Sequence, residues 1–193
     1  MKKLFSPLDL IQRVGTYYPG CDLIIPDPIC SDCPTKELGR VRSLWLQDIN
    51  YTFTDITNPA EWATAIANRH VYVFPYTQGT FTMSEVLTQG FGNVDEDLDS
   101  YECVLACMEP NFAGNRDFWN AMKSSHVYKV GWRTQTKIYY SEVPATIIPK
   151  FKIDNDLKSK VIWDLGFKFI QEDIPYVVDM PMSVFDQCID ANP

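Results

Sequence analysis

The six cysteines are the residues of this sequence with the widest range of potential chemistry. Cys30 and Cys33 are separated by two residues, with Cys21 nearby, and such a spacer lets two thiolates face one tetrahedral zinc ion. Cys103 and Cys107 do not make a second such pair, because their spacing on an expected strand separates them by roughly 13 Å. We therefore expect free thiols, with a zinc site or a disulfide in the segment around Cys30 as alternatives.

A group of carboxylates near the middle of the chain has the alternate spacing of a calcium-binding loop. Asp95, Asp97 and Asp99 supply its odd-numbered positions. However, Ser100 stands where an EF-hand requires glycine, and Ala106 stands where it requires the bidentate glutamate. We interpret these carboxylates as part of an exposed, solvated acidic loop.

Residues that could carry out catalysis are few. His70 and His126 are the two histidines, and each is expected to open a strand after a helix, where an imidazole usually bonds to nearby carbonyls. No Gly-x-Ser-x-Gly, Walker A or His-Glu-x-x-His motif occurs. Gly90 and Gly92 lack the third glycine and the strand-to-helix context of a dinucleotide loop. We predict a protein that is not an enzyme, with no cofactor and no catalytic or metal-binding residues.

The tryptophans are interpreted as structural anchors rather than as binding residues. Large rings on expected helices and strand faces dock one element onto another. The anchors that we predict are Trp45, Trp62, Trp119 and Trp163. The functional alternative is an aromatic platform that binds a sugar.

Composition limits the classes of protein that this chain can belong to. With 193 residues, 46% of them hydrophobic and 13% aromatic, the chain can bury a substantial core, so disorder is not expected. The net charge of -8 argues against a nucleic-acid-binding surface, which requires clustered Lys and Arg. An acidic wall could still let DNA pass without binding it. No run of about 20 apolar residues is present for a membrane helix.

The N-terminal region is expected to lie outside the folded domain formed by the rest of the chain. Ser6 and Pro7 interrupt the sequence before an apolar run of signal length can form, which predicts synthesis in a cytoplasm without secretion. A short helix is expected from Pro7 to Val14, followed by an extended arm rich in Pro, Asp and Cys. The predicted organisation is a helix and arm at residues 1–40 and a single β-rich domain at residues 41–193.

Period-two patterns dominate the predicted domain. The predicted strands cover residues 41–55, 70–74, 80–83, 101–108, 127–133, 137–140, 146–153, 161–170 and 174–178. Residues 87–100 have no period and are predicted to form an exposed loop. These elements predict a β-rich α+β fold of eight to ten strands, in a sandwich or barrel-like core, with two or three short helices.

The first helix of this domain has a clear start signal. Asn58 is placed to cap it, Pro59 occupies its first position, and the carboxylate of Glu61 is expected to return to the amide of Asn58. A second helix is expected to start at Asn115 and to end near Ser124.

Residues 58–86 recur in altered form at residues 115–143. Shared letters include Trp62 with Trp119 and Ser84-Glu85-Val86 with Ser141-Glu142-Val143. This similarity raises the hypothesis of an internally duplicated unit, a helix followed by a β-hairpin. The alternative is two similar local elements without common origin.

Three segments carry a resemblance to a protein family. They are the N-terminal SPLDLIQRV, the strand and capped helix LWLQDINYTFTDITNPAEW, and the closing strand VIWDLGFKFI. Together they resemble virion structural proteins of crAss-like tailed phages of Bacteroidetes. The resemblance implies a non-enzymatic virion subunit of a symmetric ring in the collar or tail, such as a head-tail connector or a tail-tube-like protein, or a subunit on the head surface.

A ring implies contacts with identical copies and with other virion proteins, while DNA passes through the lumen and no membrane is involved. Long segments that build no active site are the expected contact regions. The residues assigned to such contacts are Cys21, Cys30, Cys33, Phe91, Asp95 and Asp97. The alternative function is a carbohydrate-binding or receptor-binding adhesin module, suggested by the aromatic content and the β-rich pattern.

Overall fold

The computed structural model describes residues 39–90, 92, 96–123, 125–153, 161–179, 181 and 184–185, which all lie in the compact unit Lys36–Pro193. Nine strands and two helices are present in this part of the chain. Their order is β1 (Ser43–Asp48), α2 (Pro59–Ala67), β2 (Val71–Phe74), β3 (Gln78–Thr88), β4 (Asp97–Glu109), α3 (Arg116–Ala121), β5 (Tyr128–Arg133), β6 (Lys137–Pro144), β7 (Thr146–Lys152), β8 (Ile162–Gln171) and β9 (Tyr176–Asp179). The prediction of a β-rich α+β fold is confirmed.

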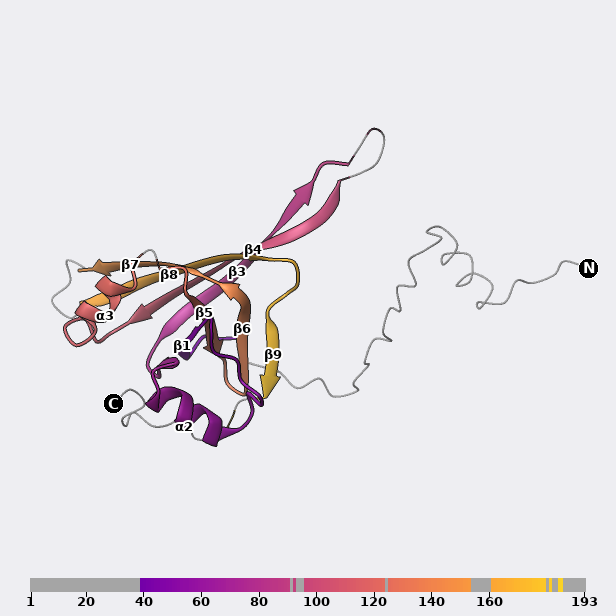
Figure 1. The fold of residues 1–193 in the computed structure, drawn as a ribbon. Helices are drawn as coiled ribbons and strands as arrows, with labels where there is room; N and C mark the ends of the chain where they lie inside the picture. Colours follow the sequence, from indigo (N-terminus) through magenta and orange to yellow (C-terminus); the bar gives the residue numbers. More distant parts are fainter. Residues whose placement is uncertain are drawn as a thin grey trace, which may run out of the picture. The chain divides into compact units, whose positions relative to one another are not determined.

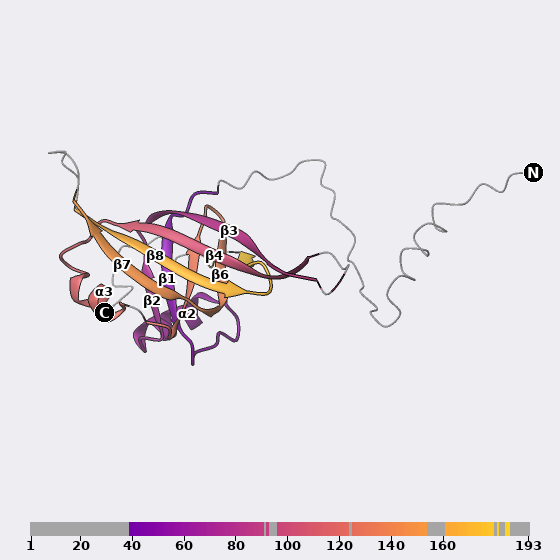
Figure 2. The same ribbon diagram turned by 90° about the horizontal axis from the view of Figure 1, so that it is seen from above.

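The strands form two antiparallel sheets, shown in Figures 1 and 2. One has five strands in the order β2-β1-β5-β6-β9, and the other has four in the order β3-β4-β8-β7. The described strands do not close into a barrel, so the sandwich is the form of the prediction that the structure supports. The chain changes sheets at short connections, such as Ala145 between β6 and β7.

The four-stranded sheet follows the alternation read from the sequence. On β8, Trp163, Leu165, Phe167 and Phe169 are buried, while Asp164 on the opposite face is exposed. The register joins Phe167 to a buried residue on each neighbouring strand, and these partners are Leu105 on β4 and Ile147 on β7. Each such side chain contributes about 1.5–3 kcal/mol by leaving water.

In the five-stranded sheet, strand β1 is buried on both faces. Leu44 and Leu46 of β1 belong to the main core, which also contains the inner face of the four-stranded sheet. Trp45 belongs to a second core with Trp62 and Ala65 of α2. The sequence places Leu44 and Leu46 on a face that also carries polar residues, and packing in the main core removes these two side chains from water, while α2 covers the opposite face at Trp45.

Helix α2 starts as predicted, with one correction. The side chain of Asn58 accepts a hydrogen bond from the amide two residues on, and Pro59 lies in the first turn. The carboxylate of Glu61 does not return to the Asn58 amide, which instead donates to the carbonyl of Asp55. Glu61 accepts from the amides of Thr54 and Asp55, at 2.6 and 2.9 Å. The chain entering the helix presents these two amides, and the carboxylate binds both.

The structure does not support the duplication hypothesis. In the second segment β5 and β6 pair as a hairpin, but in the first segment β2 pairs with β1 and β3 pairs with β4, in different sheets. Trp62 and Trp119 are both buried, yet they lie in separate cores. The shared letters therefore do not correspond to a shared helix-hairpin unit.

The predicted loop at residues 87–100 is also corrected. Strand β3 continues to Thr88 and β4 begins at Asp97, and the two pair with Leu87 opposite Leu98. A register shift after Val86 interrupts the alternation, and the side chains around it are largely exposed. Without a buried face this segment carries no period-two pattern, so its strand character was not evident from the sequence.

Candidate interaction surfaces

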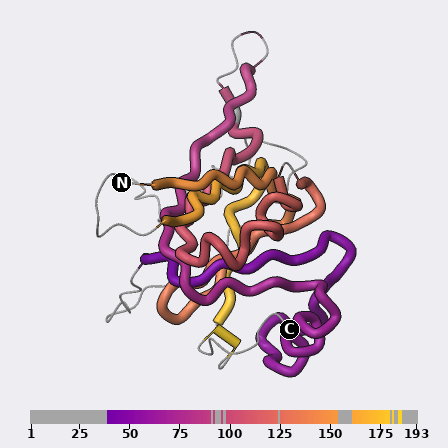
Figure 3. Tube along the Cα trace, turned by 90° about the vertical axis from the view of Figure 1, so that its left-hand side faces the viewer, coloured from indigo at the N-terminus to yellow at the C-terminus, as the bar shows by residue number. Residues whose placement is uncertain are grey.

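The first candidate surface is the end of the β3–β4 hairpin, which extends beyond the four-stranded sheet (Figures 1 and 3). Strand β4 pairs with β8 from Tyr101 onward, where Tyr101 faces Gln171. Residues before Tyr101 on β4 pair with β3 alone. This extension, which we call the hairpin tip, comprises the described residues of the range 85–100.

The hairpin tip combines exposed leucines with negative charge. Leu87 and Leu98 lie opposite each other, and their side chains are 50% and 46% exposed. Glu85, Glu96 and Asp99 are also exposed. No Lys or Arg occurs anywhere in residues 70–115, so the tip carries charge of one sign.

The two outer strands of the four-stranded sheet differ in how well they are protected against pairing with a further strand. Strand β7 carries Pro149, which lacks an amide donor, and the exposed Lys150; proline and lysine are common devices against edge-to-edge pairing. Strand β3 has eleven residues without either. Apart from a single bridge between Val41 and Gly79, β3 has no described partner on its outer side. Beyond that bridge, no strand among the described residues covers this edge of β3.

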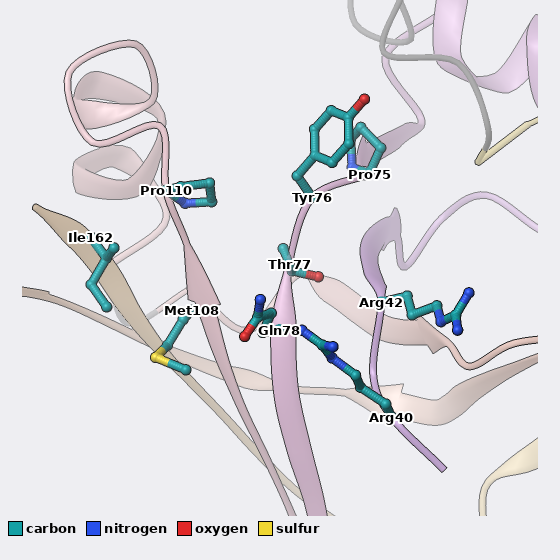
Figure 4. Close-up of a pocket in the computed structure, with 9 residues that line it drawn as sticks. All are labelled: Arg40, Arg42, Pro75, Tyr76, Thr77, Gln78, Met108, Pro110 and Ile162. Atoms are coloured by element: carbon teal, nitrogen blue, oxygen red, sulfur yellow. The ribbon is translucent and has the colours of Figure 1, made fainter. Parts of the chain in front are cut away.

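The second candidate surface is a pocket of about 650 Å³ at the other end of β3 and β4 (Figure 4). Its lining residues come from four separate segments of the chain. They are Arg40, Arg42, Pro75, Tyr76, Thr77, Gln78, Met108, Pro110 and Ile162. Figure 4 shows Arg40 reaching toward Gln78, with Met108 and Ile162 on one side of β3 and Arg42 on the other.

The pocket is cationic and partly apolar. The backbone of Arg42 is held by β5 and by the start of β3, because its amide donates to Arg133 O at 2.8 Å and its carbonyl accepts from Thr77 N at 3.2 Å. Neither Arg40 nor Arg42 forms an ion pair with a carboxylate of the described residues. Tyr76 and Met108 are 61% and 44% exposed.

An adjoining hollow of about 360 Å³ shares Arg40 and Met108 with the pocket and adds Asp164. The Oγ1 of Thr77, a lining residue of the pocket, is buried and has no hydrogen-bond partner among the described residues. A pocket with these groups can bind an anionic group that has an apolar neighbour. Sequence reasoning missed it, since no local pattern joins its segments.

The predicted anchors Trp45, Trp62, Trp119 and Trp163 are all buried, and so is Trp132. Trp62 Nε1 donates to Ile56 O at 2.7 Å, and Trp163 Nε1 donates to Phe112 O at 3.1 Å. No tryptophan ring therefore presents a face to a sugar.

Cys103 and Cys107 are free thiols, buried on one face of β4. Burial raises the pKa of the Cys107 thiol to about 12 and also raises the pKa of Cys103. A metal binds the thiolate, which burial disfavours here. Within the described ranges, no group of three or more His, Cys, Asp or Glu side chains is arranged to hold a metal ion.

The assigned contact residues Cys21, Cys30, Cys33, Phe91 and Asp95 lie outside the described residues, as does the predicted N-terminal helix. The backbone of Asp97 is described and opens β4.

The two histidines occupy structural positions. The ring of His70 stacks on Tyr51, with centroids 4.9 Å apart and planes at 8°. The Nδ1 of His126 lies 3.2 Å from the hydroxyl of Thr146. Both contacts fix local packing at the start of a strand or beside one.

Comparisons with protein-family models, curated proteins and solved structures give no match to this chain. Neither described helix combines the length and the apolar character that crossing a membrane requires.

Proposed function

We propose that this protein is a non-enzymatic virion structural subunit, which forms a symmetric ring in the collar or tail of a crAss-like tailed phage. The observation that carries the proposal is the hairpin tip, an ordered extension that exposes two leucines and contributes nothing to either core. The phage assignment itself rests on the resemblance of the sequence segments.

The energetics of the tip favour a partner. Ordering a backbone costs about 1–2 kcal/mol per residue, and an isolated two-stranded hairpin is marginally stable in water. In the rest of the domain this cost is offset by burial of apolar side chains, but Leu87 and Leu98 remain about half exposed. Contact with another chain would remove these side chains from water and offset the cost at the tip.

The two ends of the four-stranded sheet carry opposite charge, and this difference supports a ring over a two-fold dimer. One end carries the acidic tip and the other carries the cationic pocket, so the complementary surfaces are different patches of one molecule. Contacts between different patches are heterologous, and they close into a ring when the rotation between subunits permits it. Each contact must bury at least about 1,000 Å² to be specific, and the open edge of β3 and the predicted arm can supply further area.

The net charge of -8 is compatible with a ring that surrounds DNA without binding it, because carboxylates repel phosphates. The subunit would be made in the host cytoplasm and then incorporated into the virion.

An adhesin module is the second candidate, and one observation favours it. Tyr176 on β9 stacks on Tyr140, with ring centroids 5.4 Å apart, and Tyr176 is partly exposed. Tyrosine pairs of this kind can contact a sugar ring. Specific binding of the purified protein to a glycan array, lost in Tyr176→Ala, would support this candidate.

The ring is tested by native mass spectrometry and negative-stain electron microscopy of the purified full-length protein. We expect one closed oligomer of defined stoichiometry, visible as a ring. A protein that remains monomeric at high concentration would contradict the proposal, as would its absence from purified virions in a proteomic measurement.

A further inference from the structure

The hairpin tip and the pocket lie at opposite ends of the same two strands. Gln78, which lines the pocket, and Thr88, at the tip, begin and end β3. The ten residue steps between them span roughly 33 Å at the rise of an extended strand. A paired strand cannot fold back over that distance, so the tip cannot fill the pocket of its own molecule.

We propose that the hairpin tip of one copy of this chain docks into the Arg40–Arg42 pocket of the next copy. Leu87 and Leu98 contact Met108 and Tyr76 there, and the carboxylates of the tip face the two guanidinium groups. The inference rests on the proposed function, because it names the surfaces by which identical subunits join.

Charge complementarity selects a second copy as the occupant. The tip carries Glu85, Glu96 and Asp99 with no cation in its stretch of sequence. Arg40 and Arg42 have no carboxylate partner among the described residues. Guanidinium groups bind carboxylates in paired, charge-assisted hydrogen bonds, and charges at an interface set orientation and association rate.

The apolar groups match in the same way. Met108 and Tyr76 are exposed at the pocket, as the two leucines are at the tip. A volume of about 650 Å³ falls within the range of specific binding sites, and such a hollow can receive side chains that project from a narrow hairpin. Burial of these groups supplies affinity, whereas the charges supply direction.

Asp164 limits where the carboxylates of the tip can lie. It lines the adjoining hollow together with Arg40, so an incoming carboxylate is repelled from that side. The contact is therefore expected to depend more on Arg42 than on Arg40.

The test uses charge reversal in the full-length protein, with assembly followed by sedimentation velocity and native mass spectrometry. Arg42→Glu and Asp99→Lys should each weaken self-association by about tenfold or more, which corresponds to 1.4 kcal/mol or more. The double variant Arg42→Glu with Asp99→Lys should recover assembly, because the pair is restored with its signs exchanged. Circular dichroism melting checks that each variant is folded.

Matched controls lie on or beside α3, and they line neither the pocket nor the hairpin tip. Asp117 and Lys123 are exposed, and the variants Asp117→Lys and Lys123→Glu should assemble as the wild type does. Wild-type assembly that is unaffected by Arg42→Glu and by Asp99→Lys overturns the docking inference and leaves the ring proposal standing. A monomeric wild type overturns both.

A direct readout complements the charge series. A photo-crosslinking amino acid at position 98 should capture a peptide that contains Tyr76 or Met108 in a covalent dimer. Capture of residues from the open edge of β3 would instead indicate strand addition and would overturn the proposed docking.

Discussion

Strands β3 and β4 pass through two different environments, and the contrast separates folding from contact with other molecules. Inside the sheet β4 buries Cys103, Leu105 and Cys107 on one face, so these residues hold the two sheets together. In the hairpin tip, which precedes Tyr101 on β4, the same strands bury few side chains, and Leu98 is exposed to solvent. Substitutions in the first region should change stability, and substitutions in the second should change assembly alone.

The largest expected effect is in the body of the sheet. Phe167→Ala removes a fully buried ring that lies between Leu105 and Ile147 in the register. We expect a loss of about 3–5 kcal/mol in the free energy of unfolding, from lost transfer energy and the cavity left behind. Urea denaturation measures it. A loss below about 1 kcal/mol would mean that the body is not the rigid region assumed in the comparison.

A smaller loss is expected in the second core. A Cβ added at Gly131 would overlap the indole of Trp45, and the Trp45 side chain is fully buried between β1 and α2. Gly131→Ala should therefore cost about 1–3 kcal/mol through overpacking, measured by the same denaturation. Gly166→Ala is the matched control, because its added Cβ would meet other atoms at ordinary contact distances of 3.7 Å or more.

The raised pKa of the Cys107 thiol predicts that the stability of the fold depends on pH. Burial raises its pKa from an ordinary value of 9.0 to about 12. Between these values the unfolded chain releases a proton that the folded chain retains, so stability should fall as pH rises above 9. The slope is at most about 1.4 kcal/mol per pH unit.

Denaturation of the wild type and of Cys107→Ala at several pH values tests this dependence. The stability of the variant should decline less steeply between pH 9 and 11, because other groups titrate equally in both proteins. Parallel slopes would show that burial does not suppress ionisation of this thiol.

The smallest effect on stability is expected at the hairpin tip. Leu98→Asn changes an exposed side chain, so the free energy of unfolding should change by no more than about 0.5 kcal/mol. The same variant should assemble less well than the wild type in sedimentation velocity. A large loss of stability would contradict this expectation, because it would show that Leu98 contributes to the folded core.

Local patterns in the sequence were sufficient for several elements. The alternation of Trp163, Leu165 and Phe167 predicted strand β8 and its buried face, and Asn58 with Pro59 predicted the start of α2. These features depend on neighbouring residues along the chain, since a strand alternates every second residue and a cap binds amides within one turn. The range of eight to ten strands could be predicted for the same reason, whereas the sequence left a sandwich and a barrel-like core as alternatives.

Tertiary structure decided what depends on residues far apart in sequence. The assignment of β2 and β3 to different sheets and the burial of both faces of β1 depend on which segments meet. The bonds of Glu61 to Thr54 and Asp55 span only seven and six residues, and they depend on the path by which the chain enters α2. The pocket joins Arg40 and Arg42 to Met108 and Ile162, whose spacing in sequence carries no signal. The hairpin tip was read as a loop because strands without a buried face show no hydrophobic period, and their pairing is set by the partner strand.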